Sequence, residues 1–284
     1  MKELVVLSGK GGTGKTSIVA SFAALAQKKV LVDCDVDAAD LHLVLKPDIR
    51  QDNEFWSGQV AEIDERKCTE CGLCQELCRF EAIADFEVDP TSCEGCSFCS
   101  RICPVEAITM KERLSGHWFI SDTKYGPMVH ARLGIAQENS GKLVALVRQQ
   151  AKQIADKDGL DYIISDGPPG IGCPVISSLS GASLALVVTE PTLSGIHDLG
   201  RVVDVCRHFN VPVVVSINKY DINEDNVRHI ESYCLSQGLE ITARIPFDNA
   251  VTEAMVQGLP VVEYRDSPVS RQINLLWRSI LRLI

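Results

Sequence analysis

The sequence predicts an α/β fold, in which a doubly wound, mostly parallel sheet carries a small inserted α+β module. Along most of the 284 residues, apolar runs rich in Val and Ile alternate with segments of helical composition. This pattern is typical of parallel strands covered on both faces. A glycine-rich loop follows the first apolar run. The alternation stops where eight of the twelve cysteines gather, between Cys68 and Cys103.

Six apolar runs are predicted to be strands of the sheet, at residues 4–8, 29–33, 161–166, 183–189, 211–217 and 239–245. The segments with helical composition lie between them, at residues 16–27, 141–156, 195–209, 223–237 and 248–257. Residues 117–133 indicate two further strands joined by a turn at Tyr125-Gly126-Pro127, because glycine and proline are residues that turns select.

A last helix is predicted at residues 267–284, with an apolar stripe that includes Ile273, Leu276, Trp277 and Ile280. A helix that packs on a sheet needs such a stripe, and so does a helix that lies on a membrane surface. Single amphipathic helices are common in α/β folds. We therefore expect this helix to pack on the sheet, and we expect no membrane partner.

Composition points to a cytoplasmic protein. The first residues run directly into a strand without the apolar region of a signal peptide, and no apolar stretch approaches the length of a membrane span. The formal charge of −10 argues against non-specific nucleic-acid binding, which needs basic surface. In a reducing compartment a dense cysteine cluster indicates metal binding rather than disulfides.

The loop SGKGGTGKTS, residues 8–17, matches two phosphate-binding fingerprints. As G-x-G-x-x-G it would open a dinucleotide-binding unit, and Asp33 lies where that fold places its ribose-binding acid. As G-x-x-x-x-G-K-[ST] it is a P-loop for a nucleoside triphosphate. Lys15 and Thr16 favour the P-loop, because the ammonium reaches the β- and γ-phosphates and the hydroxyl binds Mg²⁺. A tight turn without a ligand would need neither residue.

The predicted nucleotide site follows from this motif. The run DYIISD ends in Asp166, which suits the acid that holds the Mg²⁺ environment together with Thr16. The cofactors are therefore ATP or ADP with Mg²⁺. The loop residues predicted to bind the phosphates are Gly11, Gly12, Thr13, Gly14, Lys15, Thr16 and Ser17.

The loop KGGTGKT resembles the deviant Walker A motif of the MinD/Mrp/ParA group and of the nitrogenase iron protein. This resemblance covers the chain except its cysteine-rich segment. It implies a slow P-loop ATPase in which Lys10 crosses a dimer interface to contact the partner's nucleotide, with Lys15 in the chain's own site. The dimer is a homodimer or a heterodimer with a paralogous ATPase.

Further residues are carried over by the same resemblance. Asp35 matches the acid that orients the attacking water, with Asp40 as a second acid in that loop. Alternatively, one of these acids only caps the following helix. Asn218 matches the asparagine that meets adenine, and Pro246 lies where the family packs around the base.

The cysteine-rich segment contains an internal repeat of 25 residues. Cys-x2-Cys-x2-Cys-x3-Cys occurs twice, and Pro104 follows the second copy. This is the run of bacterial two-cluster ferredoxins, in which the fourth cysteine ligates the other cluster. We therefore predict two [4Fe-4S] clusters. The first is ligated by Cys68, Cys71, Cys74 and Cys103, and the second by Cys93, Cys96, Cys99 and Cys78.

Two details qualify this pattern. Arg79 stands where the ferredoxin run has proline, which changes the charge near one cluster. Structural zinc is the alternative, although its cysteine pairs are normally well separated.

We predict an ATPase domain at residues 1–57 and 113–284, with the ferredoxin-like module at 58–112. The module carries 12 acidic and 5 basic residues, so its redox or metal-acceptor partner should present a basic patch.

Three functions follow from these features. The favoured one couples nucleotide-driven dimer closure to electron transfer or metal-centre maturation on a partner protein. The alternatives are a carrier or scaffold ATPase for iron–sulfur or other metal centres, and a MinD-like membrane-positioning ATPase.

Cys173 lies in GIGCP, seven residues after Asp166. In the nitrogenase iron protein a cysteine at this offset helps two subunits share a cluster, although that family uses a second cysteine as well. Two Cys173 thiols could hold a metal across the dimer, or Cys173 is a free thiol.

Overall fold

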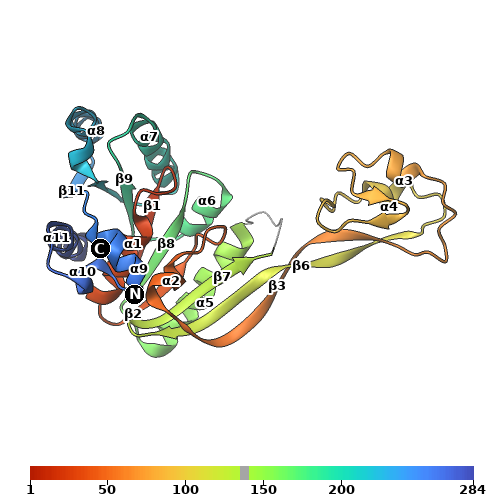
Figure 1. The fold of residues 1–284 in the computed structure, drawn as a ribbon, viewed down its shortest axis with the longest axis horizontal. Coiled ribbons are helices and arrows are strands. Elements are labelled where there is room, and N and C mark those ends of the chain that lie inside the picture. Colours follow the sequence, from red (N-terminus) through yellow and green to blue (C-terminus); the bar gives the residue numbers. More distant parts are fainter. Residues whose placement is uncertain (135–140) are drawn as a thin grey trace. The chain divides into compact units, whose positions relative to one another are not determined.

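The computed structural model describes residues 1–134 and 141–284 and separates them into two units. The first unit contains Met1–Asp52, Trp118–Arg132 and residues 141–284, and the second contains Asn53–His117 with residues 133–134. Figure 1 shows the elements of each unit along the chain. Two long strands, β3 (Asp48–Ile63) and β6 (Ile108–Thr123), have residues in both units, and so does β7 (Gly126–Leu133) through its last residue.

The large sheet has the strand order β11-β10-β9-β1-β8-β2-β7-β6-β3 within the described residues. Every neighbouring pair from β11 to β7 is parallel, which confirms the predicted α/β fold with a mostly parallel sheet. The strands not yet bounded are β1 (Lys2–Ser8), β2 (Lys29–Asp33), β8 (Tyr162–Pro169), β9 (Leu184–Thr189), β10 (Val213–Asn218) and β11 (Glu240–Ile245).

The helices between these strands agree with the prediction to within a few residues. Three short helices of the first unit were not predicted as such, α2 (Leu41–Leu45), α6 (Cys173–Leu179) and α10 (Val261–Tyr264). The others of this unit are α1 (Lys15–Leu25), α5 (Gly141–Asp158), α7 (Leu193–His208), α8 (Glu224–Ser236), α9 (Ala250–Gln257) and α11 (Pro268–Leu283), with a 3₁₀ turn at Tyr220–Ile222.

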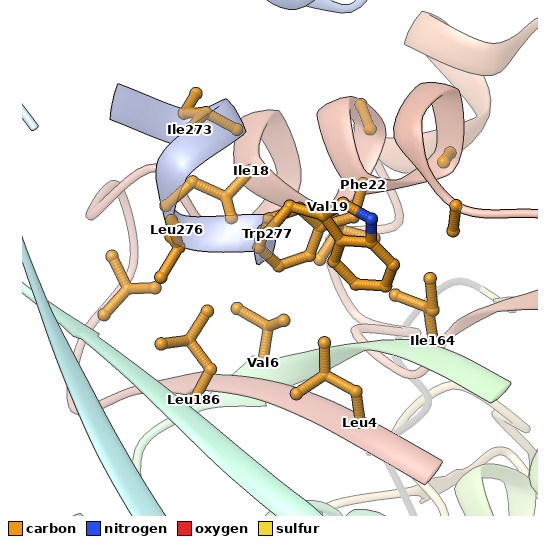
Figure 2. Close-up of a cluster of buried hydrophobic side chains, with 14 of the residues drawn as sticks. Leu4, Val6, Ile18, Val19, Phe22, Ile164, Leu186, Ile273, Leu276 and Trp277 are labelled. Atoms are coloured by element: carbon orange, nitrogen blue, oxygen red, sulfur yellow. The ribbon is translucent and has the colours of Figure 1, made fainter. Parts of the chain in front are cut away.

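Alternate side chains of β1 enter two different hydrophobic cores, one on each face of the sheet. Leu4 and Val6 belong to the core formed with α1 and α11. Figure 2 shows Trp277 and Leu276 of α11 packed with Phe22 of α1 over these strand residues. Val5 and Leu7 belong to the opposite core, which is formed with α6, α7 and α8. The sheet is therefore covered on both faces.

The apolar stripe of α11 lies in the first of these cores. Ile273, Leu276, Trp277 and Ile280 are all buried, which confirms that this helix packs on the sheet. No helix in the described residues is long and apolar enough to cross a membrane.

The second unit contains short elements between the long strands β3 and β6. These are α3 (Leu73–Glu76), α4 (Phe98–Ile102) and a two-stranded antiparallel sheet of β4 (Ile83–Ala84) and β5 (Glu87–Val88). Its core is formed by Ala61, Cys74, Ala82, Ile83, Cys93 and Ile108. Ala82 and Ile83 of the first repeat correspond to Ala107 and Ile108 of the second, and all four side chains are buried.

Candidate functional site

The predicted nucleotide residues gather at one edge of the sheet because parallel strands end there together. The glycine loop follows β1, Asp35 follows β2, Asp166 lies in β8, Asn218 ends β10 and Pro246 follows β11. A cavity of about 420 Å³ lies along this edge. Its lining includes Gly11, Gly12, Gly14, Lys15, Thr16, Ser17, Asp35, Asp40, Asn218 and Pro246.

Gly14 is the residue that lets the loop turn directly into α1. Its φ of 92° lies in the left-handed region, which a side chain disfavours. A Cβ atom at this position would also lie 2.4 Å from Nδ2 of Asn218. The Asn218 amide donates a 2.7 Å hydrogen bond to the Thr13 carbonyl. Asn218 therefore braces the phosphate loop, a contact in addition to the base contact expected of it.

Lys15 and Asp166 form the buried centre of the site. Both are nearly inaccessible to solvent, at 5% and 1% exposure. Burial raises the pKa of Asp166 to about 7, although Lys15 and a hydrogen bond from Thr16 oppose the rise. One oxygen of Asp166 and the hydroxyl of Thr13 are buried with no hydrogen-bond partner. Mg²⁺ would supply the positive charge that the Asp166 oxygen lacks, and a phosphate oxygen would accept a hydrogen bond from the Thr13 hydroxyl.

Asp33 fixes the loop that carries Asp35. It is fully buried and accepts hydrogen bonds from the backbone amides of Asp35, at 3.1 Å, and Leu41, at 3.3 Å. Both carboxylate oxygens of Asp33 are engaged by backbone amides of this loop, and this structural role favours the P-loop interpretation.

The two acids expected in the loop after β2 differ in their surroundings. Burial raises the pKa of Asp35, while Lys15 lowers it. Asp40 begins α2, but its side chain makes no capping hydrogen bond. Asp40 therefore does not serve as a side-chain cap, and both acids line the cavity.

Lys10 projects from the front of the loop and contacts residues of its own chain. Its Nζ lies 2.5 Å from Oε1 of Glu190 and donates to the Thr192 hydroxyl at 3.2 Å. Lys219 reaches the other oxygen of Glu190 at 3.1 Å. Burial alone would raise the pKa of Glu190, but hydrogen bonds from the two lysines outweigh it and hold the pKa below its ordinary value. Glu190 and Lys219 were not predicted from the sequence. Their only signal is their position just after β9 and β10.

The eight clustered cysteines line two cavities. Cys68, Cys71, Cys74 and Cys103 line one cavity of about 20 Å³. Cys78, Cys93, Cys96 and Cys99 line another of about 730 Å³, which Cys74 also reaches. Arg79, the departure from the ferredoxin run, lines the larger one.

No group of three or more His, Cys, Asp or Glu side chains in the described residues is arranged so that it could hold a metal ion. The predicted clusters and the zinc alternative therefore both rest on the spacing of the cysteines along the sequence.

The remaining cysteines divide by burial. Cys34, Cys206 and Cys234 are fully buried, as expected of small apolar side chains. Cys173 is exposed and is the first residue of α6. Gly167, which directly follows Asp166, lies within β8. A Cβ there would lie 2.5 Å from Leu7, so close packing explains this glycine.

Comparisons with known proteins agree with this geometry. Residues 4–261 match the profile of the CobQ/CobB/MinD/ParA nucleotide binding domain. The Methanocaldococcus jannaschii protein MJ0578 is 34% identical over 99% of this chain and 97% of its own length. MJ0579 of the same organism is 25% identical over 94% of this chain and 93% of its own length.

Two further likenesses are more limited. An iron-sulfur cluster carrier protein of Pyrococcus horikoshii is 28% identical over 46% of this chain and 48% of its own length. The crystal structure of the cell division ATPase MinD from Pyrococcus furiosus has a TM-score of 0.61 and 20% identity, and the alignment covers 100% of this chain and 99% of that one. This structural likeness shows the fold.

Proposed function

The chain belongs to the CobQ/CobB/MinD/ParA family of nucleotide-binding domains, and on that basis we propose that it is a Mg²⁺-dependent ATPase that works on a redox or metal centre. Nucleotide binding closes a dimer, and closure controls electron transfer or metal-centre maturation on a partner protein. The observation that carries this proposal is the presence, in one chain, of a P-loop cavity and two cysteine-lined cavities.

Each residue of the nucleotide site has a proposed task. Lys15 neutralises the phosphates from its buried position, while Thr16 and Asp166 hold Mg²⁺. Asp35 orients the attacking water. Pro246 and the neighbouring Phe247, both lining the cavity, pack against the base. Hydrolysis is slow in the isolated subunit because Lys10 stabilises the developing phosphoryl charge only in a partner's site.

In this proposal the two cysteine sets would hold two [4Fe-4S] clusters, as the ferredoxin spacing predicts. The donor chemistry is appropriate, because eight thiols in two sets of four line two cavities. When bound, such clusters supply one-electron transfer at low potential. The larger cavity has the exposed side chains Leu77, Phe80 and Phe98 in its lining, each more than 40% accessible. We propose that the partner docks there, with basic residues facing the acidic module.

The partner in the dimer is a second copy or a paralogue. Two Methanocaldococcus jannaschii proteins match more than nine-tenths of this chain, so related chains occur together in one organism. Such a pair supports a heterodimer in which each subunit contributes a lysine to the other's nucleotide.

A carrier function is the second candidate, favoured by the likeness to the Pyrococcus horikoshii iron-sulfur cluster carrier protein. Membrane positioning is not proposed, because the stripe of α11 is used in the core. The two candidates are separated by an experiment on protein purified anaerobically with its partners. Electron transfer that accelerates with ATP supports the redox role. Stoichiometric transfer of iron to the partner without net electron flow supports the carrier.

A further inference from the structure

Glu190 is a partly buried carboxylate shared by two lysines that both touch the phosphate loop. Its side chain is 13% exposed, and its two oxygens contact different ammonium groups. Lys10 takes Oε1 at 2.5 Å and Lys219 takes Oε2 at 3.1 Å. One negative charge therefore holds two positive ones, and each lysine competes with the other for it.

The two lysines are held differently. Besides Glu190, Lys219 donates a 3.1 Å hydrogen bond to the carbonyl of Gly12, and its neighbour Asn218 donates to the carbonyl of Thr13. Lys219 is therefore tied to the nucleotide cavity that it lines. Within the described residues, the Lys10 ammonium contacts only Glu190 and the hydroxyl of Thr192. Its side chain is 31% exposed, so it has room to leave.

We propose that Glu190, Lys10 and Lys219 form a lysine latch that sets how readily Lys10 leaves its own subunit. Glu190 holds Lys10 in place, and Lys219 weakens that hold by taking part of the carboxylate's charge. The idea deepens the proposed function and rests on its premise that Lys10 acts on a partner's nucleotide. Closure of the dimer must break the ion pair between Lys10 and Glu190, so the strength of this pair is a cost of closure.

The latch predicts opposite effects from two neighbouring substitutions. Glu190→Gln removes the charge that holds Lys10, so Lys10 is released. Lys219→Met leaves Glu190 entirely to Lys10, so Lys10 is held more tightly. If the three residues only supported the loop structurally, both substitutions would loosen it and act in the same direction.

The first measurement is the rate at which an acylating reagent modifies the Lys10 amine in the nucleotide-free full chain, followed by mass spectrometry. The deprotonated amine is the species that is acylated, and it is more accessible to the reagent when Lys10 is no longer held by a carboxylate. We expect the acylation rate of Lys10 to rise about fivefold in Glu190→Gln and to fall in Lys219→Met. The double variant should show the same rate as Glu190→Gln alone. Glu263→Gln, which removes an ion pair with Lys124, is the matched control and should leave the rate unchanged.

The second measurement is the ATP concentration that gives half-maximal dimer, determined by light scattering with Mg²⁺ on the chain and any paralogue that purifies with it. Glu190→Gln should lower this concentration about fivefold, and Lys219→Met should raise it. Equal labelling rates in Glu190→Gln and wild type, or shifts of the same sign in both variants, would overturn the latch.

Failure of the proposed function is distinguishable from failure of the latch. If Lys10→Ala closes as readily as wild type, Lys10 has no role across the interface, whatever the labelling rates show. If Lys10→Ala fails to close while Glu190→Gln closes like wild type, the trans role stands and the latch is wrong.

Discussion

At the scale of single residues, the two lysines of the glycine loop are distinguished by burial. Lys15 is buried beside Asp166 and Asp35, whereas Lys10 is partly exposed and paired with Glu190. Sequence spacing located both lysines, because a P-loop fixes their offsets from the glycines. Spacing did not locate Glu190, because its partner Lys10 lies far away in the chain. It did not predict the structural role of Asp33 either, because the partners of Asp33 are backbone amides in the loop that follows it.

Lys15→Ala should abolish Mg²⁺·ATP binding, with at least a hundredfold loss of affinity. The substitution removes the ammonium that neutralises the phosphates and leaves buried carboxylates facing them. Lys10→Ala should bind ATP with nearly normal affinity but hydrolyse it more slowly and dimerise less. Calorimetric titration with ATP measures both affinities. An equal loss in the two variants would contradict the separate roles.

Substitution of Cys173 tests whether the two subunits share a bound metal that responds to the nucleotide state. The thiol is exposed at the start of α6, and the chain from Asp166 to it spans only seven residues. If two such thiols hold a bridging metal, Cys173→Ser should lose metal from the ATP-bound dimer beyond the iron of the module. Iron and zinc are counted per dimer with and without ATP. Equal counts in wild type and variant would make Cys173 an ordinary free thiol.

His130 should make the fold less stable in weak acid. Burial, aided by neighbouring His42, lowers the pKa of His130 to about 4, and Nε2 lies 2.9 Å from the Ser121 hydroxyl. The unfolded imidazole takes up its proton near pH 6.5. Between about pH 6.5 and 4 the unfolded chain binds more protons, so the free energy of unfolding falls as the pH is lowered.

From pH 7 to 5, His130 should account for a loss of about 2 kcal/mol. Urea unfolding of wild type and His130→Phe at both pH values measures this contribution, because other titrating groups are common to the two proteins. Phe is chosen because the imidazole stacks on Phe119 with ring centroids 5.0 Å apart. The same pH dependence in both proteins would show that His130 is not responsible.

At the scale of elements, periodicity predicted the buried parallel strands and the last helix but not β3. The strands β1, β2, β9 and β10 are almost wholly buried, so each appears as an unbroken apolar run. β3 has the sequence DIRQDNEFWSGQVAEI, with only Phe55 and Ala61 buried. A strand that is solvated on most of its length carries little apolar pattern, so its pairing with β6 decides its conformation.

Two neighbouring leucines of α11 allow the contribution of core packing to stability to be distinguished from that of helix propensity. Leu276 is fully buried, while Leu275 is 50% exposed. Leu276→Ala should lower the free energy of unfolding by about 2–5 kcal/mol, because it leaves a cavity among α1, α11 and β1. Leu275→Ala should change it by less than about 1 kcal/mol. Urea unfolding monitored by circular dichroism gives both values, and similar losses would mean that α11 is not anchored through this stripe.

At the scale of the whole molecule, the sequence predicted two kinds of chemistry from two kinds of spacing. The glycine loop is local, so its ligand class was readable from ten residues. The partition of the cysteines is not local, because each set of four joins three residues of one run to the last residue of the other. The ferredoxin pattern supplied that pairing. In the structure one cavity is lined by four of these cysteines and the other by five, because Cys74 lines both. The spacing of residues does not identify the acceptor protein.

Iron content should therefore respond to the paired sets rather than to the order of cysteines along the chain. Protein purified anaerobically is expected to contain about eight irons per chain, with the broad visible absorbance of thiolate clusters. Cys103→Ser should perturb the cluster of Cys68, Cys71 and Cys74, although it lies in the second run. Cys78→Ser should perturb the other cluster in the same way.

The discriminating measurement pairs each variant with a substitution inside the cluster to which it is assigned. Cys103→Ser and Cys71→Ser should change the same electron paramagnetic resonance signal of the reduced protein, and Cys78→Ser and Cys96→Ser should change the other. If Cys103→Ser instead resembles Cys96→Ser, the runs fold as separate sites and the crossed pairing is wrong. Zinc at about one ion per run with no iron after anaerobic reconstitution would replace the clusters altogether, and the module would then have no electrons to transfer.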